Sequence, residues 1–199
     1  MKILGVTGGS GTGKTVVCRI LKEQGGKIID ADVVSKKLQQ QGQPVYDAIV
    51  EHFGKDIVEA DGELNRKLLG SIVFNDKKEL QALNDIVHKH VAVEIKRRVE
   101  GYREQGDVPF VVLDVPIPIE EGFFDTCNTV WAVVANDDIR ISRLMKRMMI
   151  SEAEAVKRIG AQMSNREYSE LADCVIENEG NVEDLKKLVL FELRRFLEF

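Results

Sequence analysis

The sequence predicts an α/β fold in which a parallel sheet of five strands carries helices on both faces. Short apolar runs recur along the chain, as expected for parallel strands that are buried on both faces. Stretches with the apolar spacing of helices separate these runs, which favours a parallel sheet. The 199 residues, of which 44% are hydrophobic, suffice to bury the core of one such domain.

The expected helices and strands alternate in chain order. A helix over residues 14–24 follows the first strand, and Gly25 and Gly26 end it. A second helix is expected over 33–41. Pro44 can occupy the first turn of a helix over 45–53, and Asn181 can cap a closing amphipathic helix over 182–199. The five expected strands are residues 2–7, 27–29, 110–115, 130–135 and 174–177.

Two stretches exceed this simple alternation. Residues 54–106 contain two or three helical stretches, including a long helix over 77–105, and no convincing strand. We interpret them as an inserted helical subdomain. Residues 138–164 are expected to form an arginine-rich pair of helices that resembles a lid. No internal repeat or linker interrupts the chain, so residues 1–199 are predicted to form one domain.

Composition excludes several classes of protein. The net charge of −5 gives no support to a nucleic-acid partner. The three cysteines lie far apart without a metal-binding spacing, which indicates free thiols in a reducing compartment. The apolar start breaks at Gly8, too early for the core of a signal peptide, and no apolar run could span a membrane. We expect a cytoplasmic protein, a monomer or small homo-oligomer, that binds neither nucleic acid nor membrane.

Residues 8–15, Gly-Gly-Ser-Gly-Thr-Gly-Lys-Thr, match the phosphate-loop pattern G-x-x-x-x-G-K-[ST] in full. The glycines let backbone N–H groups turn toward an anion, and the following helix adds its dipole. Lys14 is expected to contact the β- and γ-phosphates, and the Thr15 hydroxyl to bind Mg²⁺. The flanking strand and helix predict a three-layer P-loop NTPase core. The candidate ATP-binding residues here are Gly9, Gly11, Thr12, Gly13, Lys14, Thr15 and Val16.

The loop alone does not separate kinases from GTPases or ATPase motors. No Asn-Lys-x-Asp segment is present, so a guanine-reading GTPase is not expected. The chain is short for an ATPase motor, and it carries the arginine-rich helical pair. These features favour a nucleotide-dependent kinase that acts on a small acceptor.

Carboxylates follow two of the expected strands. Asp30 and Asp32 come after residues 27–29, and in an extended segment their side chains would share one face. Ligands bind at this carboxyl edge of an open parallel sheet. We expect Asp32 to engage the acceptor hydroxyl, with an N-cap of the following helix as an equally open alternative. Asp114 ends an apolar run in the manner of a Walker-B strand, so it is a candidate Mg²⁺ ligand.

Two arginines are candidates for charge stabilisation during phosphoryl transfer. The transition state spreads negative charge, so positioned cations matter more than a strong base. Arg143 and Arg147 are four residues apart, and therefore lie on one helical face. They could close over the triphosphate, or they could belong to an ordinary solvated charged face, which is the norm for helical arginines. The candidate catalytic residues are Asp32, Lys14 and Arg143.

Beyond the loop, the chain resembles the dephospho-coenzyme A kinase family nearly end to end. Asp30-Ala31-Asp32, Leu64-Asn65-Arg66 and an Ala-Asp-x-Val-Ile-x-Asn segment that ends at Asn178 follow the loop in this order. Together these pieces are far more specific than the loop alone. The segments that carry the resemblance are residues 7–15, 29–32, 61–66, 83–88, 143–147, 158–162 and 172–180.

This resemblance implies ATP-dependent phosphorylation of the ribose 3′-hydroxyl of dephospho-coenzyme A, with Mg²⁺ as cofactor. It also implies a nucleotide core, a helical acceptor domain and a mobile lid. By motif, Asp32 looks like the residue that engages the acceptor hydroxyl, and Arg66 and His88 look like acceptor contacts. The ATP side of the resemblance comprises Arg143 and Arg147 as lid groups over the phosphates, and Asn178 and Gly180 in the adenine pocket.

The chain departs from the family pattern at several positions. Lys89 follows His88 where proline is usual, and residues 115–120 replace a typical Pro-Leu-Leu-Phe-Glu. Met148 and Met149 stand where an Asp-Gly-like pair is common, and Tyr168 stands where lysine is frequent. Two other functions stay open: a nucleoside or other small-metabolite kinase with the same core, and a nucleotide-binding regulator without turnover. The intact phosphate-handling groups favour an enzyme.

Overall fold

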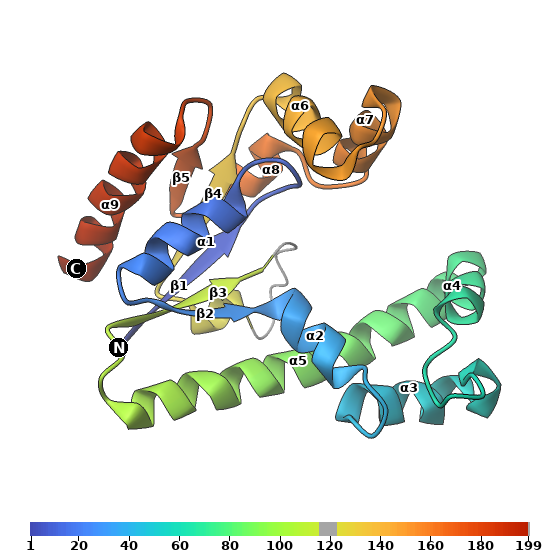
Figure 1. Cartoon of the computed structure of the whole chain (residues 1–199). Coiled ribbons are helices and arrows are strands. Elements are labelled where there is room, and N and C mark those ends of the chain that lie inside the picture. Colours follow the sequence, from blue (N-terminus) through green and yellow to red (C-terminus); the bar gives the residue numbers. More distant parts are fainter. Residues whose placement is uncertain (116–122, 199) are drawn as a thin grey trace. The chain divides into compact units, whose positions relative to one another are not determined.

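The structure, a computed structural model, describes residues 1–115 and 123–198. The chain forms two compact units, which Figure 1 shows in sequence colours. The first unit comprises Met1–Asp30 and Val99–Phe199, and the second is Ala31–Arg98. Compared with the predicted insert over 54–106, the second unit starts earlier in the chain, at Ala31, and also ends earlier, at Arg98.

The first unit is built on a parallel sheet with the strand order β2-β3-β1-β4-β5. This arrangement confirms the predicted α/β fold. Every predicted strand is present, with ends shifted by no more than one residue, because each coincides with a continuous apolar run. The strands are β1 (Lys2–Thr7), β2 (Lys27–Asp30), β3 (Phe110–Asp114), β4 (Thr129–Val134) and β5 (Cys174–Glu177).

Helices cover both faces of this sheet (Figure 1). On one face, α1 (Lys14–Glu23) and α9 (Val182–Glu198) pack over a core that includes Trp131 and Val133. Ala132 lies between these two residues in β4, so it points to the opposite face, where Tyr168 packs on it. Tyr168 belongs to α8 (Asn165–Glu170). Tyr168, which departs from the pattern of the resembled family, is therefore a core residue of the first unit.

Two further helices lie between β4 and α8. They are α6 (Asp137–Met148) and α7 (Glu152–Gly160), which pack on each other and confirm the predicted helical pair. Ser151 and Glu154 form a capping box at the start of α7. The function of this pair as a lid remains a prediction.

The second unit is helical. It contains α2 (Ala31–Leu38), α3 (Pro44–Phe53), α4 (Arg66–Asn75) and most of α5 (Lys77–Gln105). Pro44 opens α3 as predicted, and Asn65 caps α4 by accepting a hydrogen bond from Leu68 N at 2.8 Å. The described part of this unit contains one isolated β-bridge, between Val58 and Leu64.

One local prediction at the sheet edge is wrong. α2 begins at Ala31, directly after β2, instead of at residue 33. Asp30 and Asp32 therefore do not belong to one extended segment, and the spacing rule for strands does not apply to them. Asp32 lies in the first turn of α2 and is not its N-cap. A carboxylate in this turn is favourable because it faces the positive end of the helix dipole.

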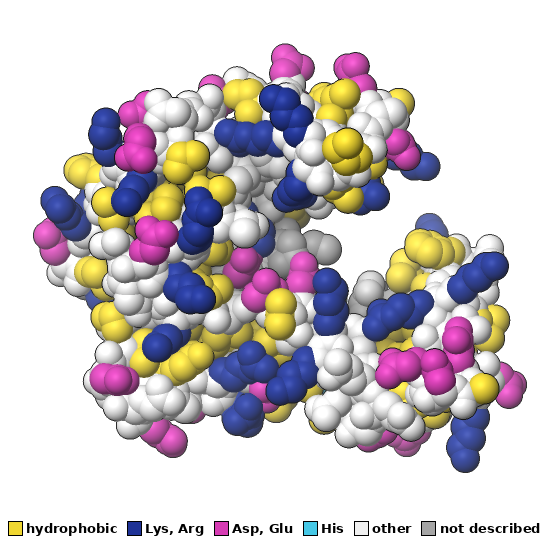
Figure 2. Space-filling model, in the orientation of Figure 1, with side chains coloured by type: hydrophobic (Ala, Val, Ile, Leu, Met, Phe, Trp, Pro, Cys, Tyr) yellow, Lys and Arg dark blue, Asp and Glu magenta, His cyan; other side chains and the backbone are white. Residues whose placement is uncertain are grey.

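The surface agrees with the modest net charge. Acidic and basic side chains are mixed over the visible face of both units (Figure 2). Among the described residues, no helix is both long enough and apolar enough to cross a lipid bilayer.

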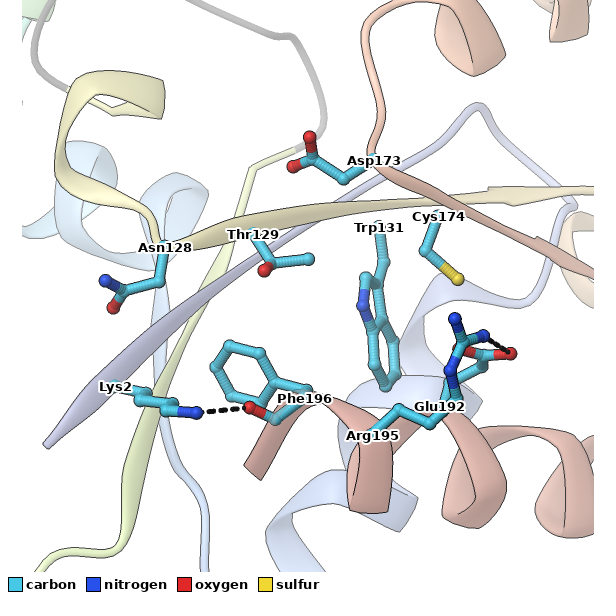
Figure 3. A pocket seen from close by; sticks show the side chains of 9 residues that line it. All are labelled: Lys2, Asn128, Thr129, Trp131, Asp173, Cys174, Glu192, Arg195 and Phe196. Carbon is cyan, nitrogen blue, oxygen red and sulfur yellow. Dashed lines mark hydrogen bonds and ion pairs between the residues drawn. The ribbon is translucent and has the colours of Figure 1, made fainter. Parts of the chain in front are cut away.

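A cavity of about 410 Å³ opens at the amino ends of the strands, beside α9 (Figure 3). Lys2 begins β1 and donates to the Phe196 carbonyl at 2.7 Å, and Cys174 begins β5. On α9, Glu192 forms an ion pair with Arg195 at 2.9 Å. The phosphate loop follows the opposite, carboxyl end of β1, so this cavity is separate from the candidate active site.

Candidate active site

The phosphate loop connects β1 to α1 at the centre of the sheet. Ligands of open parallel sheets bind at this carboxyl edge, where the connections diverge to either side of the central strand. Gly8 and Gly13 have φ values of 145° and 97°, which favour glycine. A side chain on Gly8 would also collide with the Val133 carbonyl, and one on Gly13 with the Asn178 amide. Both glycines are thus required by backbone conformation and by close packing.

Lys14 and Asp114 form an ion pair beside the loop. Lys14 is the first residue of α1, and Asp114 is the last residue of β3, the strand next to β1. Their side chains are 16% and 10% exposed, so water screens this pair only weakly. Asp114 also accepts a hydrogen bond from the Cys18 thiol at 3.4 Å. Burial, and then the Asp114 charge, raise the pKa of Cys18, which keeps the thiol protonated.

The two threonines of the loop have different environments. Thr12 is buried, and its hydroxyl donates to the Gly9 carbonyl at 2.9 Å, so this side chain holds the loop in shape. Thr15 is exposed on the first turn of α1. Val16, the next residue, is half-buried and packs on the core beneath α1. The Thr15 hydroxyl, unlike that of Thr12, is therefore accessible to a metal ion.

Arg143 of α6 contacts the phosphate loop through its backbone carbonyls. Its guanidinium donates to the carbonyls of Gly11 and Thr12 at 3.2 and 3.3 Å, and to the Asn178 carbonyl at 3.0 Å. Arg147 is exposed one turn further along α6. The predicted contacts of both arginines with ATP phosphates remain predictions.

Asn178 follows β5 and is bonded to the same loop. Its buried amide donates to the Thr12 carbonyl at 2.7 Å, and its backbone N–H donates to the Val134 carbonyl at 2.9 Å. Gly180 is exposed two residues later. The structure thus gives Asn178 a role in shaping the loop, and the adenine pocket predicted at Asn178 and Gly180 stays a prediction.

Three candidate residues belong to the helical unit. Asp32 is in the first turn of α2, and Arg66, the first residue of α4, donates to the Gln39 side chain at 3.2 Å. His88 lies midway along α5 and is half-buried. Burial lowers the pKa of His88, against an opposing effect of the Asp85 carboxylate. A neutral imidazole can both donate and accept a hydrogen bond.

Comparison with known proteins identifies the family. The sequence model of dephospho-CoA kinase matches residues 2–184. The chain belongs to the dephospho-CoA kinase family. It is 37% identical to a dephospho-CoA kinase from Carboxydothermus hydrogenoformans, over 98% of this chain and 95% of that one. It is 41% identical to a dephospho-CoA kinase from Lactobacillus johnsonii, over 92% of each chain.

A solved structure shares the fold of this chain. The crystal structure of TT1252 from Thermus thermophilus superposes with a TM-score of 0.78 at 29% sequence identity, covering 98% of this chain and 97% of that one. Dephospho-CoA kinases are ATP-dependent kinases, so the chain is a transferase of this class. The predicted main function, phosphorylation of dephospho-CoA with ATP, is that of the family.

The structure also places around the loop three residues whose role the sequence left open. Arg140 of α6 donates to the Ser10 carbonyl at 3.0 Å, and Gln162 accepts from Ser10 N at 2.8 Å. Asn165 lies behind Arg140, 3.4 Å from its guanidinium. The spacing in the sequence could have indicated Arg140, because it precedes Arg143 by three residues and therefore lies on the same face of the helix.

Proposed function

We propose that this site transfers the γ-phosphoryl group of ATP to the ribose 3′-hydroxyl of dephospho-CoA. The observation that carries the proposal is the Lys14–Asp114 pair at a complete phosphate loop in a chain of this family. The 3′-oxygen forms a bond to the γ-phosphorus, and the bond from this phosphorus to the bridging oxygen breaks. CoA and ADP are then the products.

The loop binds the triphosphate of the donor. Four loop carbonyls, from Gly9 to Thr12, accept hydrogen bonds from protein groups, so the loop is shaped before ATP arrives. Lys14 contributes the cation for the β- and γ-phosphates, where its charge counts most as the γ-phosphoryl group leaves. Arg143 and Arg147 supply further positive charge from α6, and Asn178 and Gly180 border the adenine.

Mg²⁺ fits the donor set of this site. The candidate ligands are the Thr15 hydroxyl and the Asp114 carboxylate, and Mg²⁺ prefers such oxygen ligands. Mg²⁺ at P-loops keeps water and phosphate ligands, so one carboxylate and one hydroxyl suffice to hold it. When bound, the ion would neutralise charge on the β- and γ-phosphate oxygens.

The acceptor side of the proposal rests on the helical unit. Asp32 orients the 3′-hydroxyl and receives its proton as the new bond forms. Arg66 is exposed at the start of α4, free to move to an anionic group of dephospho-CoA, since its bond to Gln39 is on the surface. His88 supplies a neutral hydrogen-bonding group. The range 54–106 would then contribute acceptor contacts, and 138–164 would act as the lid.

We further propose a cytoplasmic location and a monomeric or small homo-oligomeric state. The three cysteines are free. Burial raises the pKa of Cys127 to about 12 and that of Cys174 to about 11, so these thiols stay protonated at neutral pH. Such unreactive free thiols suit a reducing compartment. Light scattering after size-exclusion chromatography measures the oligomeric state.

Kinetics of acceptor-site variants test the proposal against the alternative of another small-metabolite or nucleoside kinase. Arg66→Met and His88→Gln should raise the KM for dephospho-CoA about 10-fold each, as expected for a lost charge-assisted or neutral hydrogen bond. The KM for ATP should not change. Lys67→Met, an exposed neighbour of Arg66 on α4, is the matched control. If both variants kept the wild-type KM for dephospho-CoA, these acceptor assignments would be wrong.

A further inference from the structure

Arg140 is a buried arginine behind the phosphate loop. It lies in the first turn of α6 and is 1% exposed, whereas Asp137, its ion-pair partner at 2.9 Å, is 62% exposed at the side chain. Burying a guanidinium costs several kcal/mol unless its donors are satisfied. A single exposed carboxylate compensates for only part of this cost. The stability of α6 alone therefore does not explain why the Arg140 guanidinium is buried.

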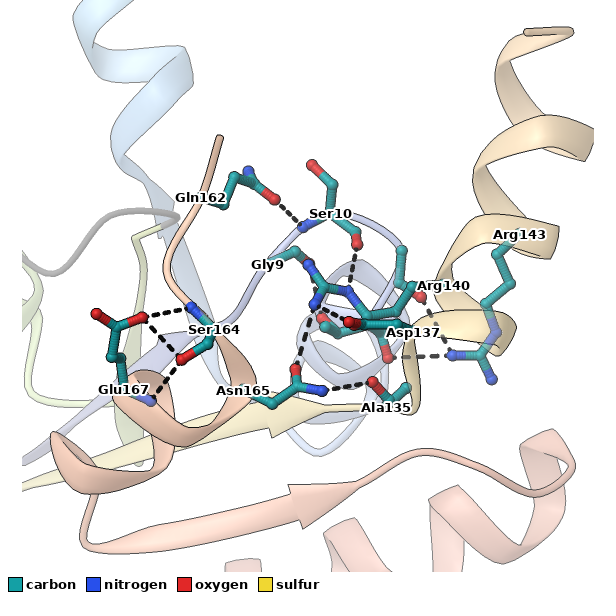
Figure 4. A network of polar contacts seen from close by, with 12 residues as sticks. Gly9, Ser10, Ala135, Asp137, Arg140, Arg143, Gln162, Ser164, Asn165 and Glu167 are labelled. Atoms are coloured by element: carbon teal, nitrogen blue, oxygen red, sulfur yellow. Dashed lines mark hydrogen bonds and ion pairs between the residues drawn. The ribbon is translucent and has the colours of Figure 1, made fainter. Parts of the chain in front are cut away.

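The guanidinium directs its other nitrogens at the loop (Figure 4). Nε donates to the Ser10 carbonyl at 3.0 Å, and Nη1 also lies 3.4 Å from the Asn165 side-chain oxygen. Nη2 is buried without a hydrogen-bond partner among the described residues. A Cβ atom on Gly9 would lie 2.5 Å from this same Nη2. The guanidinium thus fills the space where residue 9 would otherwise carry a side chain.

The backbone of Arg140 also touches the loop. A Cβ atom on Gly11 would lie 2.8 Å from the Arg140 carbonyl oxygen and 2.9 Å from its Cα. Gly11 is therefore required by the backbone of α6, in addition to any requirement from the phosphates, whereas a side chain at position 9 would have to displace the Arg140 guanidinium. This contact docks the first turn of α6 directly on the loop.

The bond to Ser10 has a consequence for the N–H groups of the loop. In a trans peptide, the carbonyl and the next N–H point in opposite directions. The Ser10 carbonyl points to Arg140, so the Gly11 N–H points away from it. In the same way, the Thr12 carbonyl points to Asn178 and Arg143, which turns the Gly13 N–H away from them. Anion-binding loops need N–H groups converged on one side.

Two further side chains, those of Asn165 and Gln162, lie beside Arg140 and Ser10. The Asn165 side-chain N–H donates to the Ala135 carbonyl at 2.8 Å, which directs its oxygen at Arg140. Gln162 accepts from Ser10 N at 2.8 Å, on the other side of the same residue. The Ser10 carbonyl therefore accepts a hydrogen bond from Arg140, and the Ser10 N–H donates one to Gln162. Asn165 contacts the Arg140 guanidinium from behind.

We propose that Arg140 is a positioning residue for phosphoryl transfer, which sets the orientation of the Ser10–Gly11 peptide and adds positive charge behind the triphosphate. The proposal rests on the proposed binding of ATP in this loop. It assigns Arg140 a role that Arg143 cannot replace, because Arg143 is bonded to the Gly11 and Thr12 carbonyls. Asn165 and Gln162 support this role from α8 and the segment before it.

Steady-state kinetics of the full chain test the proposal. Arg140→Met keeps much of the side-chain volume and removes the charge and the bond to Ser10. We expect the KM for ATP to rise at least 10-fold and kcat to fall, with the KM for dephospho-CoA unchanged. Lys146→Met, an exposed cation on the same helix, is the matched control and should leave all three constants unchanged. Asn165→Ala should shift the KM for ATP in the same direction by a smaller factor.

A double-mutant cycle tests the contact itself. Gly9→Ala should impair ATP binding in the wild-type chain because the new methyl group displaces Nη2. In an Arg140→Ala background the same change should cost at least fivefold less. A folded Arg140→Met enzyme with wild-type kinetic constants, or a Gly9→Ala cost that is the same in both backgrounds, would overturn the proposal. If Arg140→Met does not fold, Asn165→Ala and the Gly9→Ala cycle on Arg140→Lys decide.

Lys14→Ala separates this inference from the proposed function. If Lys14→Ala loses most of its turnover and Arg140→Met is normal, the loop binds ATP and the inference about Arg140 is wrong. If Lys14→Ala has wild-type turnover, the proposed function of the loop fails, and the inference fails with it.

Discussion

At the scale of single residues, the active-site proposal depends on charges held in specific pairs. Lys14 pairs with Asp114, and Arg143 is bonded to the loop and to Asn178, all in positions that water screens weakly. Interactions of this kind are strong because the surroundings have a low effective dielectric constant. Removing one partner leaves the other charge uncompensated, so the effects on catalysis should be large.

Lys14→Ala should lower kcat about 10²–10³-fold while the protein stays folded, since the lost cation acts on developing charge. Circular dichroism and a thermal melt would verify folding, and Lys22→Ala, an exposed lysine on α1, is the control. Unchanged turnover in Lys14→Ala would refute the role of this residue.

Asp32→Asn should slow phosphoryl transfer more than it weakens ATP binding. Its position in the first turn of α2 means that a stability cost of up to about 1 kcal/mol is also expected from the helix dipole. Asp47→Asn makes the same change in the first turn of α3 and calibrates this cost. A variant that merely melted earlier, with normal transfer, would show that Asp32 acts on the helix and not on the acceptor.

His88 makes stability depend on pH. Burial lowers its pKa in the folded chain below the ordinary value of 6.5, so the unfolded chain binds the proton more readily. The free energy of unfolding should therefore decrease as pH falls from about 6.5, until His88 also becomes protonated in the folded state. In urea titrations from pH 8 to 5, His88→Gln should lack this part of the decrease. Parallel pH profiles for both proteins would contradict the lowered pKa.

Much of the site could be predicted at this scale, and the failures have a physical cause. Lys14 and Asp114 follow apolar runs that identify their strands, so local patterns place them. Arg140 contacts Ser10, a residue 130 positions away, and no local pattern reports such a contact. The environment of Asp32 was missed because the start of α2 depends on where β2 ends, and helix boundaries are poorly fixed by sequence.

At the scale of elements, α6 combines a docked first turn with an exposed end. Its N-terminal residues contact the loop, whereas Met149 ends it with φ at 55°, the left-handed region. Met149 is the one non-glycine residue in this region among the described parts of the chain. This conformation creates a local strain that no packing offsets, since Met149 is 89% exposed.

Met149→Gly should increase the free energy of unfolding by about 1 kcal/mol, because a left-handed conformation costs other residues about that much. Met145→Gly, inside the same helix, should have the opposite effect and decrease stability by about 1 kcal/mol. Chemical denaturation of both variants checks these signs. A destabilised Met149→Gly protein would show that the left-handed cap is not strained.

At the scale of the whole molecule, the sequence predicted the nucleotide unit well. Its five strands and their flanking helices are each indicated by a local sequence pattern. The parallel direction of the strands follows from the alternation of strands and helices. The second unit was harder to delimit. It starts at Ala31, the first residue of α2, where the sequence pattern marks no domain boundary, and it ends inside the continuous helix α5. Residues 115–120, a departure from the family pattern, lie largely outside the described residues.

Product analysis decides whether the chain makes CoA from dephospho-CoA. The chain should be incubated with ATP, Mg²⁺ and dephospho-CoA, and the product examined by mass spectrometry and ³¹P NMR. We predict one ADP released for each CoA formed, with the new phosphomonoester on the ribose 3′-oxygen and kcat lowered about 10²–10³-fold in Lys14→Ala. ADP release that does not require dephospho-CoA, or a phosphate at another position, would show that the chain does not catalyse this reaction.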